Sequence, residues 1–225
     1  MIQALIRRLS FYKKIRFFSF LYWNYFSKSL VRTDNSKLIP YKHAVIELEK
    51  GARILLGGGD IEVGCDRLKG SRAETRVRLR AGAVWSSYGG CKLSYGTTLE
   101  LLPNALLDSR YFTMNSNSVM IAAKGISLGN DVMIARSVVL YDSDFHSIVG
   151  EQGEIRNPPA PLVLGDHVWL GTNVTVLKGS RIGSGSIVGA GSIVSGNVPE
   201  NVIYSTERTE KIKENAGGWS RKSPN

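Results

Sequence analysis

The most regular pattern of apolar positions lies between Leu164 and Pro199. An aliphatic residue recurs every six positions, and a small or β-branched residue follows each one four positions later. The first set is Leu164, Leu170, Val176, Ile182, Val188 and Val194, and the second is Val168, Val174, Ser180, Ser186, Ser192 and Val198. Neither an amphipathic helix nor an ordinary strand repeats every six residues. The period predicts short strands joined by turns in a solenoid.

Each coil is expected to take about three hexads, one for each face of a triangular prism, with aliphatic side chains pointing inward. The same phase continues upstream at Leu128, Ile134 and Leu140. Residues 141–162 break it with a polar stretch that contains three prolines. We therefore predict a loop inserted between two coils, which is where a repetitive stack usually carries its function.

The remaining chain divides by composition. We predict a basic, aromatic N-terminal helical segment at residues 1–41, a β-helix domain at 42–200, and a C-terminal helix with a tail at 201–225. Residues 1–42 hold nine Lys/Arg and one acid, so they carry +8 of the net charge of +10. The rest of the chain carries a net charge of only +2, which gives no reason to expect a nucleic-acid partner.

The N-terminal residues 1–30 allow two interpretations. Charges interrupt each apolar run, which argues against a signal peptide and against a membrane-spanning helix. Because the ends of a solenoid must be covered, the segment can cap the first coil. As a basic amphipathic element it can also make peripheral contact with an anionic membrane. The two interpretations are compatible.

Candidate chemistry lies at the start of the inserted loop, where His146 follows Asp142 and Asp144. A neutral imidazole can accept a proton near neutral pH, and a neighbouring carboxylate can stabilise the charged form. Judged from residue types alone, a single loop histidine is more often an ordinary surface residue. The three histidines form no close pair, so no metal site is expected. Cys65 and Cys91 are expected to be free thiols.

The segment Gly165-Asp166-His167-Val168-Trp169-Leu170-Gly171 begins nineteen residues after His146. With the hexads, it resembles the hexapeptide-repeat acyltransferases. The loop Asp142-Ser143-Asp144-Phe145-His146-Ser147-Ile148 resembles the branch that O-acetylates capsule and lipopolysaccharide. The resemblance implies an all-β, left-handed parallel β-helix with an inserted active-site loop. The hand comes from the resemblance alone, because parallel crossovers are ordinarily right-handed.

The resemblance also implies roles for individual residues. His146, supported by Asp144, would act as general base, and Asn117 and Asp142 would hold the acceptor, with Asn115 as an alternative to Asn117. Acetyl-CoA, the co-substrate, would lie between subunits of a homotrimer, and no metal would be required. The residues expected along CoA are Trp169, Gly171, Gly189, Ala190, Ser192 and Lys211. His167 would have a structural or CoA-adjacent role.

The function expected from this resemblance is acetyl-CoA-dependent O-acetylation of a sugar hydroxyl in a bacterial surface polysaccharide, either capsule or O-antigen. The protein would then work in the cytoplasm, with a place at the inner face of the membrane. One alternative is N-acetylation of an amino-sugar nucleotide, or acetylation of a small acceptor such as serine or a simple galactoside. A non-catalytic solenoid scaffold is an alternative of a different class.

Overall fold

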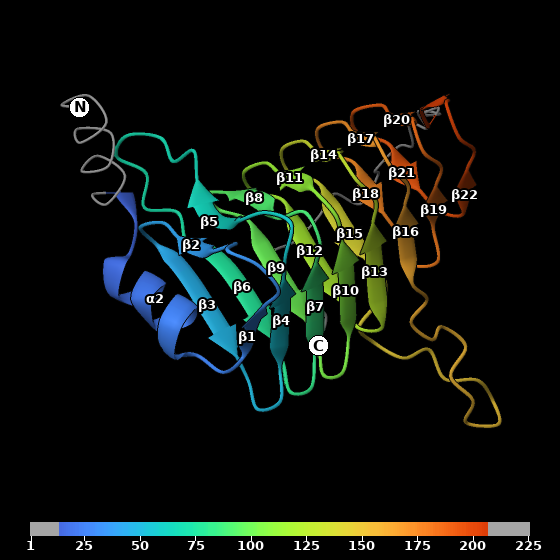
Figure 1. The fold of residues 1–225 in the computed structure, drawn as a ribbon. Coiled ribbons are helices and arrows are strands. Elements are labelled where there is room, and N and C mark those ends of the chain that lie inside the picture. The colour runs from blue at the N-terminus through green and yellow to red at the C-terminus, as the bar shows by residue number, and fades with distance from the viewer. Residues whose placement is uncertain (1–13, 207–225) are drawn as a thin grey trace, which may run out of the picture.

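The computed structural model describes residues 14–206. Its strands form three parallel sheets, and the chain visits them in strict rotation, one strand per sheet in each coil. Because each strand pairs with the strand three places earlier and three places later, the sheets are the faces of a solenoid (Figure 1). The predicted parallel β-helix is confirmed.

The first sheet contains β1 (Leu30–Arg32), β4 (Arg53–Leu56), β7 (Val84–Ser87), β10 (Leu106–Ser109), β13 (Gly125–Leu128), β16 (Leu162–Leu164), β19 (Arg181–Ile182) and β22 (Asn197–Val198). The second contains β2 (Leu38–Pro40), β5 (Ile61–Cys65), β8 (Cys91–Ser94), β11 (Phe112–Met114), β14 (Val132–Ile134), β17 (Trp169–Leu170), β20 (Ile187–Val188) and β23 (Ile203–Tyr204). The third contains β3 (Ala44–Leu48), β6 (Thr75–Leu79), β9 (Thr98–Leu101), β12 (Val119–Ala122), β15 (Val139–Tyr141), β18 (Thr175–Val176) and β21 (Ile193–Val194).

The hexad residues form the core of the C-terminal coils. Leu164 pairs with Ile182, which lies eighteen residues later, so three hexads make one coil there. All six aliphatic positions of the repeat are buried, and so are the six small or β-branched positions. The upstream residues Leu128, Ile134 and Leu140 are also buried. The inward direction predicted for the repeat is therefore correct.

The predicted N-terminal boundary of the solenoid, at residue 42, is wrong. β1 pairs with β4 from Leu30, and β2 pairs with β5 from Leu38, so the first coil starts twelve residues earlier. These two strands lie in a basic stretch that has no six-residue phase, which is why composition assigned them to the helical segment. At the other end, β23 continues the second sheet to Tyr204. The helix predicted beyond it lies outside the described residues.

A short helical element covers the first coil. It consists of α2 (Phe17–Leu21) and the π-helical turn η1 (Tyr22–Phe26). The buried Asn24 amide group donates to the Leu38 carbonyl (2.8 Å) and accepts from the Leu38 N–H (3.0 Å). Asn24 therefore satisfies backbone groups at the open end of the second sheet, and the capping interpretation of this segment is confirmed for its described part.

The loop inserted in the repeat spans residues 142–161, between β15 and β16, one residue shorter at each end than the predicted 141–162. β13 nevertheless pairs directly with β16, Leu128 opposite Leu164, so the coils on either side stay in register. The insertion projects from the body of the solenoid (gold in Figure 1). No helix among the described residues is long and apolar enough to cross a membrane. Cys65 and Cys91 are free and buried, and burial raises the pKa of the Cys65 thiol to about 12.

Candidate functional site

The insertion is a small antiparallel hairpin. Val149 and Ile155 form its bridge, the Gly150 N–H donates to the Glu154 carbonyl at 2.8 Å, and the Arg156 N–H donates to the Ile148 carbonyl at 2.9 Å. These hydrogen bonds give the loop its own backbone framework. The hairpin can therefore hold a side chain at a set position outside the prism.

His146 lies at the base of this hairpin and is exposed. The Asn157 amide donates to the His146 carbonyl at 2.9 Å and so fixes its backbone. Within residues 14–206 the imidazole itself makes no hydrogen bond or ion pair. A histidine held by its backbone, with a free and accessible ring, is suited to receive a proton from a bound acceptor.

Asp144 does not hydrogen-bond the His146 ring. Its Oδ2 instead accepts from Lys178 Nζ at 2.5 Å and from the Asn157 amide at 2.8 Å. The hydrogen bond from Lys178, followed by that from Asn157, holds the pKa of the Asp144 carboxyl below its ordinary value. Lys178 lies one coil further along, so this contact fastens the hairpin to the solenoid. The support of His146 by Asp144 stays a prediction.

Asp142 is fully buried where the hairpin leaves β15. Its carboxylate accepts three backbone N–H groups, from Ala123 (2.6 Å), Lys124 (2.7 Å) and Gly125 (2.6 Å). These contacts tie the start of the hairpin to the turn before β13. The structure therefore gives Asp142 a structural task that its sequence position did not reveal, and acceptor binding by Asp142 stays a prediction.

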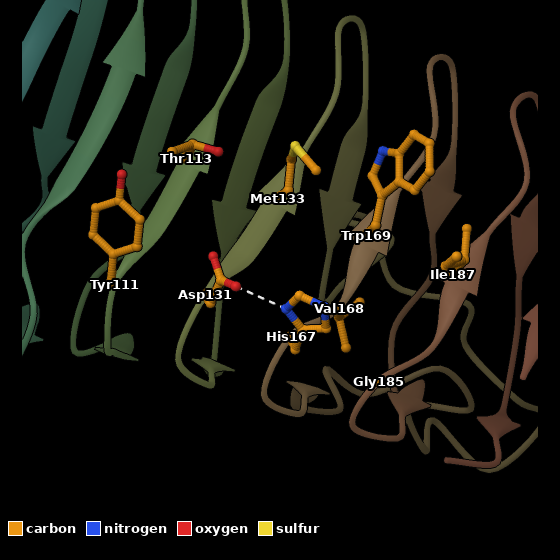
Figure 2. A pocket seen from close by; sticks show the side chains of 9 residues that line it. All are labelled: Tyr111, Thr113, Asp131, Met133, His167, Val168, Trp169, Gly185 and Ile187. Carbon is orange, nitrogen blue, oxygen red and sulfur yellow. Dashed lines mark hydrogen bonds and ion pairs between the residues drawn. The ribbon is translucent and has the colours of Figure 1, made fainter. Parts of the chain in front are cut away.

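A second group of residues forms a shallow pocket of about 310 Å³ on the outer face of the second sheet. Trp169 is 45% exposed there, while its neighbour Leu170 points into the core. Figure 2 shows the lining, which consists of Tyr111, Thr113, Asp131, Met133, His167, Val168, Trp169, Gly185 and Ile187. The pocket thus presents one apolar aromatic wall with polar groups along one edge.

The polar edge of this pocket contains a pair that the sequence did not predict. His167 Nδ1 lies 2.7 Å from Asp131 Oδ2, and both side chains are exposed (Figure 2). Both residues have positive φ, +54° and +59°, because they occupy equivalent turns of successive coils. Their separation of 36 residues, a multiple of six, was the available signal, since the insertion preserves the phase. His167 thus faces outward from the turn before β17, and its structural or CoA-adjacent role stays a prediction.

Apart from Trp169, the residues predicted along CoA lie in different places. Gly171, Gly189 and Ala190 lie where the second sheet turns into the third. A Cβ on Gly171 would come within 2.7 Å of the Ala190 nitrogen, so this glycine allows close stacking of two coils. Ser192 is buried, and its Oγ accepts from the Thr206 N–H at 3.3 Å. Lys211 lies outside the described residues.

Asn117 lies at the same corner of the prism in an earlier coil, in the turn between β11 and β12. It is exposed and has a φ of +64°, a conformation that asparagine tolerates better than most residues. The hairpin with His146 leaves a different corner, between the third sheet and the first. The acceptor role of Asn117 stays a prediction.

The topology separates the two halves of the candidate site. The hairpin leaves the corner between the third and first sheets, whereas Trp169 faces outward from the second sheet. In a three-faced prism that corner lies opposite that face. His146 and Trp169 of one chain therefore occupy opposite sides of the solenoid. Among residues 14–206, no group of three or more His, Cys, Asp or Glu side chains is arranged to hold a metal ion.

Comparison with known proteins identifies the repeat. Residues 161–196 match the family described as bacterial transferase hexapeptide (six repeats). Residues 161–196 therefore carry bacterial transferase hexapeptide repeats. A polysialic acid O-acetyltransferase of Neisseria meningitidis is 45% identical over 69 residues, which cover 30% of this chain and 32% of that protein. A putative lipopolysaccharide biosynthesis O-acetyl transferase of Escherichia coli K12, WbbJ, is 35% identical over 100 residues, 40% of this chain and 50% of that one.

The solved structure of the polysialic acid O-acetyltransferase OatWY has the same fold, with a TM-score of 0.50 and 20% identity over 81% of this chain and 93% of that one. The left hand expected for the β-helix is confirmed. The chain spans about a third to a half of the length of the curated relatives named above. The resemblance to hexapeptide-repeat acyltransferases found in the sequence is thus confirmed.

Proposed function

We propose that this protein is an acetyl-CoA-dependent O-acetyltransferase that acts on a sugar hydroxyl of a bacterial surface polysaccharide, with His146 as its general base. The observation that carries the proposal is the hairpin between β15 and β16. It presents the exposed, unpaired imidazole of His146 at a set position. It does so nineteen residues before the Gly-Asp-His-Val-Trp-Leu-Gly segment that resembles the acyltransferases.

The chemistry is a direct transfer. A neutral His146 imidazole takes the proton of the acceptor hydroxyl as the oxygen attacks the thioester carbonyl of acetyl-CoA. The tetrahedral intermediate collapses, the C–S bond breaks, and the imidazolium returns its proton to the leaving thiolate. The products are the acetylated sugar and CoA. Catalysis then requires the neutral form of His146 at the start of each cycle.

The opposite positions of His146 and Trp169 within one chain support a site shared between copies. A neighbouring copy in a homotrimer can set its Trp169 face against this hairpin, so each site would contain groups from two chains. The apolar wall formed by Trp169 and Met133 suits the pantetheine arm of acetyl-CoA, which has a long, uncharged chain. Gly171 and Ala190 lie at the edge of the second sheet, in the turns that lead to the third sheet.

The choice of acceptor rests on two relatives. One is named as a polysialic acid O-acetyltransferase and the other as a putative lipopolysaccharide biosynthesis O-acetyl transferase. Both names describe acetylation of bacterial surface glycans. We therefore propose a surface polysaccharide, or a precursor of one, as the acceptor class.

The first experiment measures CoA thiol release from acetyl-CoA with wild type and His146→Ala, against polysaccharides, amino-sugar nucleotides, serine and simple galactosides. Loss of the general base should lower kcat by about 10²–10⁴-fold with a glycan acceptor. The matched control is His43→Asn, which alters another exposed histidine and suits its φ of +66°. Full activity in His146→Ala would show that His146 is not the general base. If wild type releases no thiol with any acceptor, the protein is a non-catalytic scaffold. A preference for an amino-sugar nucleotide would show that the acceptor is not a surface polysaccharide.

A mixing experiment tests the shared site. Co-expressed His146→Ala and Trp169→Ala chains should regain activity in mixed trimers, because some sites then combine an intact histidine with an intact tryptophan. Random assembly predicts about a quarter of wild-type activity. Each variant alone should be far less active. A mixture that stays as inactive as its components would contradict the shared site while leaving the His146 assignment intact.

A further inference from the structure

We propose that the N-terminal cap docks this protein onto the surface of an anionic phospholipid bilayer. The docking surface is the outward side of α2 and η1, here called the aromatic face and made up of Phe18, Tyr22, Tyr25 and Phe26. This inference does not rest on the proposed acetyltransferase activity. It concerns the end of the solenoid formed by the first coil, whereas the hairpin leaves the stack four coils later.

The four side chains of the aromatic face are large and largely apolar, yet all of them are exposed. Phe18 is 84% exposed and Phe26 is 73% exposed, with Tyr25 at 60% and Tyr22 at 53%. The spacing of Phe18, Tyr22 and Phe26 is four residues, so successive turns of the helical element present them on one side. Phenylalanine and tyrosine prefer the boundary between lipid headgroups and acyl chains. A cluster of this kind marks an interaction surface rather than scattered surface residues.

The opposite side of the same element is fixed to the solenoid. Trp23 is buried in the core, and the Asn24 amide bonds both backbone groups of Leu38. The preceding residue pair is also anchored, since the Ile15 backbone bridges Tyr41 and the Arg16 N–H donates to the Pro40 carbonyl at 2.8 Å. The aromatic face is therefore held outward by a rigid cap. It cannot turn inward without breaking the end of the second sheet.

The charges around this face favour an anionic partner. Residues 14–33 contain four cations, Lys14, Arg16, Lys28 and Arg32, and no acidic residue. Lys37 and Arg32 lie over the Tyr25 ring, at 5.6 and 5.8 Å from its centroid, so positive charge reaches the aromatic face itself. The nearest acid in sequence, Asp34, is occupied by the N–H groups of Ser36 and Gly58. Basic groups beside exposed aromatics are the pattern of a peripheral membrane-binding surface.

A basic pocket of about 400 Å³ adjoins the start of α2. It is lined by Arg16, Lys42, His43 and Arg72, together with Val45 and Glu74. The Glu74 carboxylate is already paired with Arg76 at 2.7 Å, which leaves the cations in excess. A lipid phosphate carries the negative charge that such a pocket attracts. The pocket therefore supplies a second, independent reason to expect an anionic surface at this end of the molecule.

The same charge argues against a second copy of this chain as the occupant. Residues 1–42 carry +8, so two aromatic faces brought together would place two strongly positive segments in contact. Such repulsion opposes self-association, whereas an anionic bilayer attracts the segment over about one Debye length. Charge complementarity thus selects the bilayer over a dimer.

The test is vesicle co-sedimentation of the full chain. Wild type should bind vesicles of equal parts phosphatidylcholine and phosphatidylglycerol, bind pure phosphatidylcholine at least tenfold more weakly, and lose affinity as salt is raised. The double variant Phe18→Ser/Phe26→Ser should lose at least tenfold in affinity. Lys14→Gln/Lys28→Gln should lose affinity and part of the salt dependence. The matched control is Tyr88→Ser, because Tyr88 is 59% exposed but lies in a turn of the solenoid.

Three results would overturn the proposal. They are no binding to anionic vesicles, equal binding by wild type and the aromatic double variant, or equal loss in the Tyr88→Ser control. Sedimentation equilibrium without lipid tests whether a second copy of the chain occupies the aromatic face. If wild type self-associates and the aromatic double variant does not, the face is an interface between copies. Thiol release in detergent-free solution is measured in parallel. It separates failure of membrane docking from failure of the proposed activity.

Discussion

The two ends of this solenoid share one topology but differ in how they fill it. The N-terminal coils, up to about β12, have strands of three to five residues, and their interior holds large side chains such as Trp85, Phe112 and Met114. The C-terminal coils, from β17 onward, have strands of two residues, and valine and serine dominate their interior. A wide coil needs bulky residues to fill it, whereas a narrow coil closes on small ones.

At both ends, glycine stands at points where neighbouring coils approach closely. A Cβ on Gly171 would lie 2.7 Å from the Ala190 nitrogen, and one on Gly165 would lie 2.7 Å from the Ser184 nitrogen. A Cβ on Gly125, at the edge of the wide coils, would meet nothing closer than 3.5 Å. In the wide coils, a Cβ on Gly59 would lie 2.6 Å from the Gly89 carbonyl oxygen and one on Gly89 would lie 2.6 Å from the Tyr111 nitrogen. Both ends therefore depend on glycine at close approaches, and only the wide coils also depend on bulky interior side chains. The hairpin with His146 lies between the wide coils and the narrow coils.

The largest effect is expected from core truncation in the wide coils. Trp85→Ala removes a fully buried indole that donates to Ser109 Oγ at 3.0 Å, and it should lower the free energy of unfolding by about 3–5 kcal/mol. Val188→Ala in a narrow coil should cost about 1.5 kcal/mol. Denaturant unfolding followed by circular dichroism measures both. Equal losses would mean that interior volume does not distinguish the two regions.

The next effect concerns the junction between the regions. Asp142→Ala leaves three backbone N–H groups, those of Ala123, Lys124 and Gly125, without their carboxylate partner, and should destabilise the fold by about 3 kcal/mol. Asp108→Ala, at an exposed outward position on β10, should change stability by less than about 0.5 kcal/mol. Thermal unfolding compares the two variants. An unchanged midpoint in Asp142→Ala would contradict the structural task assigned to this residue.

A smaller effect tests the close stacking of the narrow coils. Gly171→Ala forces its new methyl group against the backbone of the next coil and should cost about 1–3 kcal/mol. Gly125→Ala has room for the methyl group and should stay within about 0.5 kcal/mol of wild type. Hydrogen exchange locates the loss in each variant. Loss of protection around β20 in Gly171→Ala, but none in Gly125→Ala, is the expected result.

The smallest effect concerns the fastening of the hairpin by Asp144 and Lys178. Because the folded-state pKa of Asp144 lies below its ordinary value of 3.8, its contribution is present above about pH 4 and is lost as the pH falls through the lowered pKa. Asp144→Asn should therefore raise hydrogen exchange at the hydrogen-bonded amides of Gly150 and Arg156 at neutral pH, and acidification should do the same in wild type. Global stability should hardly change, since the carboxylate is exposed. Equal exchange in both proteins at neutral pH would refute the anchor.

The sequence predicted the narrow coils well and the wide coils poorly. From Leu164 onward every hexad position has the burial that the pattern indicated. In the first coil, β1 and β2 were missed, because strands of three residues in a basic stretch show no six-residue phase. The resemblance named His146 as the candidate base; the structure places it exposed on the hairpin, and its role stays a prediction. The Asp131–His167 pair and the three-amide contact of Asp142 were not predicted, because each joins different coils of the stack.

The six-residue period by itself determined the solenoid, the inward side chains of its C-terminal coils and the place of the insertion, because local periodicity dictates which side chains face the core. Only the tertiary structure decided that Asp144 binds Lys178, that Asp142 holds a neighbouring coil, and that the aromatic face points outward while Trp23 is buried. Each of these contacts depends on which coil stacks on which. It also decided that His146 and Trp169 lie on opposite sides of one chain, because that relation depends on the order in which the chain visits the three faces.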